Sequence, residues 1–396
     1  MKDKNANAPE IRFEGFTDDW IQCKLGDVCG NFKSGNGITS DSIFDVGVYP
    51  VYGGNGMRGY TNTFTHNGDF VLIGRQGALC GNINSVLGKV YISEHAIVIS
   101  ENESSNIAYL EQLLSKLQLN RYSESSAQPG LSVDKLKKID VVIPKKEEQT
   151  AIGTFFRTFD NAIHNHQQKL NCLRELKKGY LQQMFPQDGE TVPKVRFAGF
   201  TGDWQNVHLG DVVEKLKSYS LSRDVETSDV TGYRYIHYGD IHKQVADIII
   251  DDGQLPCIKI GDYIALKQGD LVLADASEDY IGIAEPCVIL HEPQEQIIAG
   301  LHTIAIRPIS TDSLFLYHLF HTDGFRKFGG FVGTGLKVFG ITFPNLSKYE
   351  MKLPSFAEQA AIGGFFLNLD MQISSTITKL EKLKQLKAAY LQKMFV

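Results

Sequence analysis

The chain has 396 residues, of which 42% are hydrophobic and 22% charged, so it has the composition of an ordinary globular protein with two or three domains. Its net charge of −6 argues against a protein that clamps nucleic acid unaided, because phosphate contacts need lysine and arginine. The six cysteines form no CxxC pair and the first ten residues lack a signal-peptide core, which favours a reducing cytoplasm over a disulfide scaffold or a zinc site. No apolar run approaches the roughly 20 residues of a membrane-spanning helix.

Two segments of the chain are each written twice. Residues 12–28 (RFEGFTDDWIQCKLGDV) and 196–212 (RFAGFTGDWQNVHLGDV) are identical at 11 of 17 positions. Residues 143–185 and 353–395 are identical at 20 of 43 positions, without a gap. The inserts between these segments do not repeat, so the sequence predicts one frame used twice, with internal pseudo-two-fold symmetry and two different inserts.

The first insert is predicted to be mostly β. Short β-prone runs lie at 70–73, 89–92 and 96–99, and helical spacing covers 108–119. Residues 54–59 fit GxGxxG, but no apolar helix follows, so we expect a glycine-rich turn rather than a dinucleotide site. Side chains suited to reading base edges crowd these turns, although exposed turns are often polar without a function. The candidates are Asn55, Arg58, Arg75, Gln76 and Asn82.

The first long repeat segment, residues 145–186, is predicted to be one helix that Pro186 ends. Steps of four and three residues give a heptad-type seam over about five heptads. Lys177 interrupts the seam, as Lys387 does in the second copy, and we expect these side chains to snorkel to solvent rather than to set the register. The seam residues are Ile152, Phe156, Phe159, Ile163, Leu170 and Leu173. A polar linker follows at 187–194.

The second insert, within 195–354, also has β-prone runs, at 262–266, 271–274, 287–290 and 302–306, and helical spacing at 314–325. Its candidate DNA-reading side chains are Tyr235, Tyr238, His242, Lys243, Ser277 and Lys337. Acidic pairs such as Asp251 and Asp252 leave a two-site enzyme as a minor alternative. The sequence contains no P-loop, HExxH or other recognisable metal-ligand spacing, so no catalytic or metal residue is predicted.

The second long segment, 355–396, repeats the helix, and Ser355 with Glu358 predicts a capping box at its start. Its seam residues are Ile362, Phe366, Leu369, Ile373, Leu380 and Leu383. The predicted fold class is therefore α+β, with two mostly-β domains, 11–144 and 195–354, separated by two long coiled-coil helices.

The repeated frame, RFxGFTxDW…LGD before each insert and ELKKGYLQQMF or QLKAAYLQKMF after it, resembles the specificity subunit of type I restriction–modification systems. The resemblance covers essentially the whole chain. It implies a non-catalytic subunit whose inserts are target-recognition domains, each reading one half of an asymmetric bipartite site in double-stranded DNA. The two coiled-coil helices would pack antiparallel and act as a ruler that fixes the spacer between the half-sites.

The resemblance also implies partners in a cytoplasmic complex. Two methyltransferase subunits would dock on the frame, bind S-adenosylmethionine and methylate adenine N6, and restriction subunits would join through them. This chain would itself hold no cofactor. The alternative is a two-fold protein adaptor that binds two proteins and does not itself read DNA.

Overall fold

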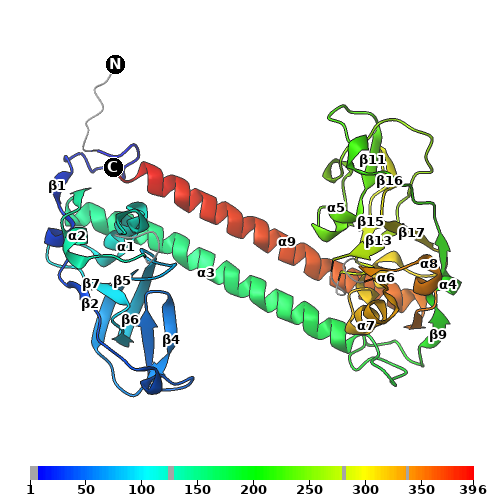
Figure 1. Ribbon diagram of the computed structural model, residues 1–396, viewed down its shortest axis with the longest axis horizontal. Helices are drawn as coiled ribbons and strands as arrows, with labels where there is room; N and C mark the ends of the chain where they lie inside the picture. Colours follow the sequence, from blue (N-terminus) through cyan, green and yellow to red (C-terminus); the bar gives the residue numbers. More distant parts are fainter. Residues whose placement is uncertain (1–7, 124–128, 279–281, 336–338) are drawn as a thin grey trace. The chain divides into compact units, whose positions relative to one another are not determined.

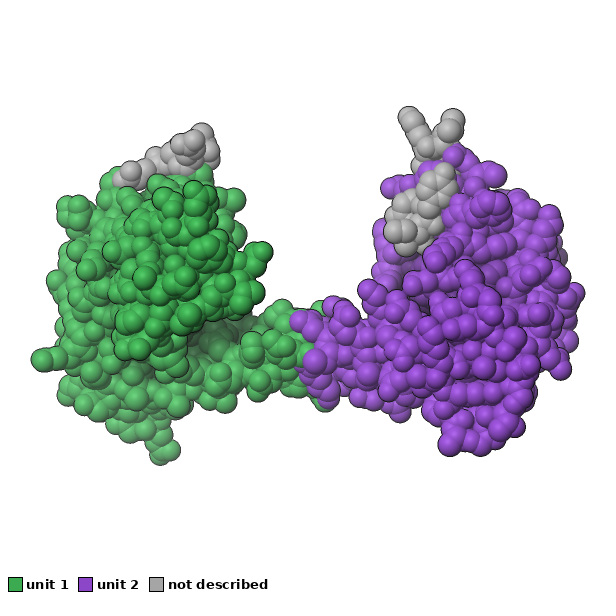
Figure 2. Space-filling view, turned by 90° about the horizontal axis from the view of Figure 1, so that it is seen from below, with its two compact units in different colours: residues 1–168, 377–396 green, residues 169–376 purple. Residues whose placement is uncertain are grey.

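The computed structural model describes residues 8–123, 129–278, 282–335 and 339–396. The chain divides into two compact units, residues 1–168 with 377–396 and residues 169–376, which Figure 2 colours separately. The division runs through the two longest helices, α3 (Lys146–Gln183) and α9 (Phe356–Lys393). Each has 38 residues and is therefore about 57 Å long at ~1.5 Å per residue. Within the described ranges, no helix combines the length and apolar character that crossing a membrane requires.

The first unit is built on a six-stranded sheet with the order β2-β7-β5-β6-β3-β4 (Figure 1). Neighbouring strands are antiparallel except β3 and β6, which are parallel. Helix α1 (Ile107–Lys116) contacts β5 and β6, and the short helix α2 (Val133–Lys137) follows it. The strands are β2 (Phe32–Ser34), β3 (Tyr49–Gly53), β4 (Gly56–Thr61), β5 (His66–Gly74), β6 (Ile83–Ile92) and β7 (Ala96–Ile99).

The second unit contains a five-stranded sheet with the order β10-β17-β13-β15-β12. This order and the strand directions match β2-β7-β5-β6-β3, including one parallel pair, β12 with β15. Two inserts with unrelated sequences therefore share one sheet topology. The strands are β10 (Val213–Lys215), β12 (Ile248–Ile249), β13 (Leu271–Ala274), β15 (Pro286–Ile289) and β17 (Thr303–Pro308).

Smaller elements complete the second unit. Strand β11 (Tyr233–Ile236) pairs in parallel with β16 (Gln296–Ala299), and β14 (Ala276–Ser277) pairs with β18 (Phe339–Gly340). The short helices are α4 (Leu209–Val212), α5 (Tyr238–His242), α6 (Ser313–Leu319), α7 (Asp323–Val332) and α8 (Phe343–Leu346).

The short repeat closes each unit in the same way. In the first unit it forms β1 (Ile21–Lys24), which pairs with β8 (Asp140–Ile143), and in the second β9 (Gln205–His208) pairs with β19 (Glu350–Leu353). Trp20 and Trp204 are buried beside these ribbons, at 2% and 4% exposure. An arginine of the short repeat also pairs with a glutamate in the first turn of a long helix. These pairs are Arg12–Glu148 at 2.7 Å and Arg196–Glu358 at 2.6 Å.

The two long helices pack against each other inside both units. In the first unit the ring centroids of Phe155 on α3 and Tyr390 on α9 lie 5.1 Å apart. In the second unit Phe365 of α9 meets Tyr180 of α3 at the same 5.1 Å. The start of each helix therefore lies against the end of the other, which confirms the antiparallel pairing. Of the predicted seam residues, eight are buried (Ile152, Phe156, Leu170, Leu173, Ile362, Phe366, Leu369, Leu380) and four half-buried (Phe159, Ile163, Ile373, Leu383).

The sequence analysis predicted that the seam lysines snorkel to solvent, and this prediction was wrong. The ammonium of Lys177 lies 2.5 Å from a carboxylate oxygen of Asp370, and that of Lys387 lies 2.5 Å from Asp160. Each pair joins α3 to α9, so the polar positions connect the helices at a fixed register. Heptad spacing could not indicate these partners, because each lies about 200 residues away in the sequence.

A third polar side chain accompanies each pair and differs between the units. Gln112 donates from its side-chain amide to Asp160 at 3.3 Å. The corresponding residue, six positions after the helix cap, is His318, whose Nδ1 lies 3.9 Å from Asp370. His318 is fully buried and, within the described part of the chain, neither ring nitrogen has a hydrogen-bond partner. Burial holds the pKa of His318 well below its usual value.

Two local predictions were wrong, and a third is only partly confirmed. Residues 262–266 form no strand, and their chain is held instead by single bonds such as Leu266 N–H to Ile297 O at 2.8 Å. The run 314–325 breaks into α6 and α7, because the Thr322 hydroxyl caps the second helix. The capping box at Ser355 is only half formed: the Ser355 hydroxyl accepts the Glu358 N–H at 3.4 Å, but the Glu358 carboxylate pairs with Arg196 instead of returning to the cap.

Candidate nucleic-acid interface

The five polar side chains singled out in the first insert gather at one end of the six-stranded sheet. Asn55 lies in the β3–β4 turn and Arg58 on β4, while Arg75 and Gln76 follow β5 and Asn82 precedes β6. Of the glycine-rich turn predicted for 54–59, only residues 54 and 55 form the β3–β4 turn, because residues 56–59 belong to β4. Asn55 and Arg58 are both exposed. Their use in DNA reading stays a prediction.

A close contact of backbones holds this surface together. A Cβ atom at Gly54 would lie 2.9 Å from the Cα of Gly74 and 2.7 Å from the carbonyl oxygen of His95, so only glycine fits there. The neighbouring Gly53 lies against the side chain of Arg58, where a Cβ would come within 2.9 Å of Cδ. The glycine pair thus places the β3–β4 turn directly against the start of the loop that carries Arg75.

That loop, residues 74–82, is fixed by its own backbone. Gly74 N–H donates to Asn82 O at 2.8 Å, and Gly81 N–H donates to Gly74 O at 2.8 Å. Cys80 N–H donates to Gly77 O at 3.0 Å, and Gly77 N–H reaches Pro129 O at 3.0 Å. Backbone held in this way presents its side chains without a large entropic cost of ordering on binding.

The charges of Arg58 and Arg75 are not paired with any carboxylate among the described residues. Seven arginines elsewhere in the chain form ion pairs with carboxylates. The guanidinium groups of Arg58 and Arg75 have no hydrogen-bond or ion-pair partner among the residues that the structure describes. Guanidinium groups left with all their donors available suit the acceptor edges of bases and the oxygens of phosphates.

In the second unit, the candidates lie at the corresponding end of the five-stranded sheet. Tyr238, His242 and Lys243 come from α5 and the residues after it, and Ser277 follows β13. These four side chains line one hollow of about 630 Å³, together with Gln244, Glu278, Glu285 and His302. The structure therefore brings four of the six predicted residues of the second insert together.

Aromatic and imidazole rings form one wall of this hollow. The ring centroid of Tyr238 lies 5.9 Å from that of His242 and 5.3 Å from that of His302, and both pairs are edge to face. Because a carbonyl oxygen only accepts, the 2.8 Å contact of His242 Nε2 with Ala276 O makes Nε2–H the donor and leaves Nδ1 as an acceptor in the neutral ring. His302 Nδ1 lies 3.2 Å from a carboxylate oxygen of Asp275, whose pKa is raised by burial.

Strained backbone surrounds the same hollow. Gln244 has φ of 56°, Ala284 of 55° and His302 of 54°, which is the left-handed region that side chains disfavour. Only four non-glycine residues in the described ranges have positive φ, so three of them lie at or beside this hollow. Strain of this kind costs of order 1–3 kcal/mol per residue and gathers where function needs a particular geometry.

One predicted residue does not take part, and one cannot be placed. Tyr235 is fully buried and its hydroxyl donates to a Glu226 carboxylate oxygen at 2.8 Å, so it is a core residue and not a reading one. Its aromatic type was misleading because β11 faces inward at this position. Lys337 lies outside the described residues. The acidic pair is also explained: Asp252 bonds His291 at 2.6 Å and accepts two backbone N–H groups of 294 and 295.

The sequence analysis missed Asp275 and His302. Asp275 directly follows β13 and His302 directly precedes β17, so both lie at the sheet end that carries the other candidates. The available signal was positional, since Arg75 also directly follows its strand. It could not be used without knowing that the two inserts share a topology.

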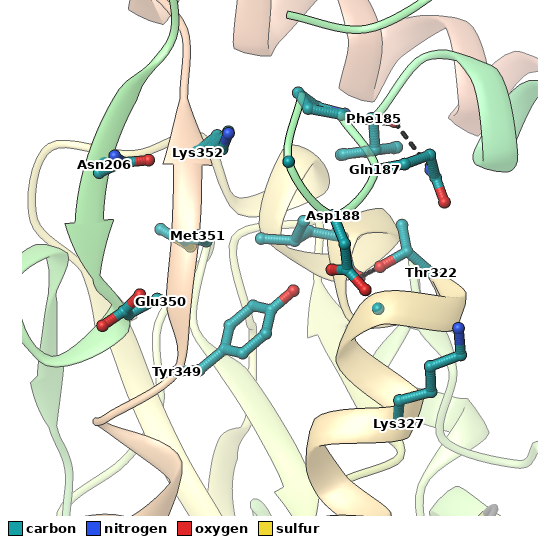
Figure 3. A pocket seen from close by; sticks show the side chains of 14 residues that line it. Phe185, Gln187, Asp188, Asn206, Thr322, Lys327, Tyr349, Glu350, Met351 and Lys352 are labelled. Carbon is teal, nitrogen blue, oxygen red and sulfur yellow. Dashed lines mark hydrogen bonds between the residues drawn. The ribbon is translucent and has the colours of Figure 1, made fainter. Parts of the chain in front are cut away.

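A second hollow, of about 250 Å³, lies within the frame of the second unit (Figure 3). The Tyr349 hydroxyl points into it towards Asp188, and burial raises the pKa of Tyr349 to about 12. Charges of both signs line this hollow, so it favours no one ligand class. Elsewhere too, the described ranges hold no group of three or more His, Cys, Asp or Glu placed to bind a metal ion.

Two recognition-type domains of one topology, each presenting polar loops and carried on paired helices, define a protein that binds through two different surfaces. The family model described as the type I restriction modification DNA specificity domain matches residues 17–175 and 201–387. The chain therefore belongs to the family of type I restriction–modification specificity subunits, with two target-recognition domains and no catalytic role of its own.

Individual relatives agree with this assignment. The chain is 36% identical over 172 residues to the Escherichia coli type I restriction enzyme EcoprrI specificity subunit, a match that spans 42% of this chain and 43% of that protein. It is 22% identical over 413 aligned residues to the Methanocaldococcus jannaschii MjaVIII specificity subunit, covering 97% and 94%. The crystal structure of the S subunit from M. genitalium has the same fold, with a TM-score of 0.71 at 14% identity over 98% of this chain and 99% of that one.

Proposed function

We propose that this chain reads an asymmetric bipartite sequence in double-stranded DNA, one half-site with each unit. The observation that carries the proposal is the pair of matching sheets, which present different polar side chains at corresponding ends. In the first unit these are uncompensated arginines and amides, and in the second a tyrosine, histidines and a lysine. One topology with two sets of donors and acceptors suits two unlike half-sites.

The test exchanges one insert. Residues 21–143 are replaced by the corresponding insert of another specificity subunit, and the methylated sites of the assembled complex are mapped by sequencing. We expect one half-site to change and the other to stay. A change in both half-sites, or in neither, would contradict the assignment of one half-site to each unit.

We further propose that the paired helices set the spacer between the half-sites. Each helix is continuous through both units, and a cross-helix ion pair in each unit fixes the register. Adding seven residues after Gln168 in α3 and seven after Ile377 in α9 lengthens both helices by about 10 Å. We expect the mapped spacer to grow by about three base pairs, at ~3.4 Å each. An active complex with an unchanged spacer would show that the helices do not set the spacer length.

The partners we propose are two methyltransferase subunits, with restriction subunits joining through them. Positions that are identical in both copies, yet exposed, indicate a surface used twice. The identical leucines Leu176 and Leu386 are 45% and 39% exposed on the long helices. Lys169 and Lys379 lie seven residues before them, on the same helix face, and are also exposed. A mixed apolar and basic strip repeated on the frame suits two copies of one partner.

The remaining chemistry would belong to those partners. The methyltransferase subunits would bind S-adenosylmethionine and methylate adenine N6, in the cytoplasm where the DNA lies. They would also supply part of the phosphate neutralisation that a chain of net charge −6 lacks. A two-fold adaptor that binds only proteins is the alternative. Binding of the complex to one bipartite duplex that weakens steeply with salt would exclude it.

A further inference from the structure

The sheet ends of the two units share one structurally equivalent position. Arg75 directly follows β5 and Asp275 directly follows the matching strand β13. The N–H of Arg75 donates to His95 O at 3.0 Å, and the N–H of Asp275 donates to His302 O at 3.0 Å. In both units the accepting residue belongs to the short connection that leads into the next strand of the sheet, β7 or β17.

A second bond confirms the equivalence. The carbonyl oxygen of Arg75 accepts the N–H of Leu131 at 2.9 Å, and that of Asp275 accepts the N–H of Ile341 at 2.9 Å. Leu131 and Ile341 occupy the same place in the two repeats, one residue before the cap of α2 or α8. The backbone at 75 and 275 is thus held on both sides by the same partners, and only the side chain differs.

The two side chains have opposite hydrogen-bonding character. Arg75 offers only donors, and in the described ranges nothing in the protein occupies them. An ionised Asp275 offers only acceptors, and its side chain is 30% exposed beside the hollow of the second unit. His302 holds one of its oxygens at 3.2 Å, which fixes the carboxylate and leaves further acceptor sites.

From this equivalence we propose that position 75 in the first domain and position 275 in the second decide the base identity at one base pair of each half-site, with opposite polarity. Arg75 donates to the N7 and O6 acceptors of a guanine. Asp275 accepts from the exocyclic amino group of a cytosine. The inference rests on the proposed DNA-reading function and goes beyond it, because it names the side chain and the base chemistry in each unit.

The experiment uses the full chain assembled with the methyltransferase subunits of its own system, and the bipartite site mapped as above. Each guanine of the first half-site is replaced in turn by 7-deazaguanine, which lacks N7. We expect the replacement at one position to weaken binding by the wild-type complex roughly 5- to 150-fold. In Arg75→Gln, the same replacement should change binding less than twofold. Lys33→Gln, which removes a positive charge from strand β2, should keep the wild-type response.

The second unit is tested by the reciprocal change. Each cytosine of the second half-site is replaced by 2-pyrimidinone, which lacks the amino group, and one position should weaken wild-type binding by roughly 5- to 150-fold. Asp275→Ala, which has no side-chain acceptor, should lose that sensitivity, while Glu214→Gln on the matching edge strand β10 should keep it. Thermal unfolding of each variant checks that the fold is intact.

The outcomes separate this inference from the proposed function. If no bipartite site depends on this chain, the DNA-reading function itself is wrong. If the site is found but no guanine N7 or cytosine amino group shows a loss that depends on residue 75 or 275, the function stands and the inference is overturned. Uniform weakening of all sequences by Arg75→Gln would assign Arg75 to phosphate and would also overturn it.

Discussion

Removing one lysine at the helix seam should destabilise the second unit more than removing both charges of its pair. In Lys177→Met, the carboxylate of Asp370 stays behind, with only 17% of its side chain exposed. Breaking a buried pair on one side costs about 3–5 kcal/mol. Protonating an ordinary aspartate at pH 7 costs about 4 kcal/mol, which sets an upper limit on the penalty. We therefore expect a loss of about 3 kcal/mol in the free energy of unfolding.

Replacing both members should restore most of this stability. Burial already raises the pKa of Asp370 more than Lys177 lowers it, so the ionised pair gains little over apolar residues. Lys177→Met with Asp370→Leu should lie within about 1 kcal/mol of wild type. The penalty of the single variant should also shrink as the pH falls towards 5, because a folded-state pKa raised above the unfolded value favours folding as the proton binds.

The first unit offers a matched control. Asp160 is 36% exposed and keeps the amide of Gln112, so water screens it and Lys387→Met should cost only about 1 kcal/mol. Urea unfolding followed by the fluorescence of Trp204, in a Trp20→Phe background, reports the second unit, and the fluorescence of Trp20 in a Trp204→Phe background reports the first. A smaller loss in the free energy of unfolding for Lys177→Met than for Lys387→Met, or a double variant as unstable as Lys177→Met alone, would contradict this expectation.

Three further outcomes are expected. Gly363→Ala should lower the melting temperature, because its Cβ would lie 2.7 Å from another Cβ in α6, whereas Gly364→Ala, with nothing within 4 Å, should add up to about 1 kcal/mol. His318→Gln should raise the free energy of unfolding by about 1 kcal/mol, because its amide can donate to Asp370. Burial lowers the pKa of His318, so below about pH 6.5 the unfolded chain binds a proton that the folded chain does not, and the wild type loses stability. His318→Gln should abolish that loss. Leu176→Asp should leave urea unfolding unchanged but reduce the number of methyltransferase subunits per complex, measured by native mass spectrometry.

The frame could be predicted from the sequence because its physics is local and written twice. Heptad spacing identified the long helices and their seam. The ion pairs were missed because heptad spacing describes one helix and not its partner. The repeat nevertheless held the signal, since Asp160 and Asp370 are identical in both copies and lie on the helix opposite each lysine.

The inserts were less predictable because their sheets depend on non-local pairing. Strand β12 has two residues and β10 has three, too short for any periodicity to detect. Their shared topology therefore could not be read from unrelated sequences, and the equivalence of positions 75 and 275 depended on it. Tyr235 is a different case: its position in a polar run predicts exposure, but its strand turns this side chain towards the core.

The exchange of helix ends between the units has a consequence for synthesis on the ribosome. The core of the first unit contains Met394 and Phe395, and the Phe395 ring stacks on Tyr109 at 5.2 Å. About 250 residues must be translated after β8 before that ring exists, which takes roughly 12–50 s at ~5–20 residues per second. During that time the nascent first domain has an open apolar site, and a ribosome that stalls late leaves both domains unfinished.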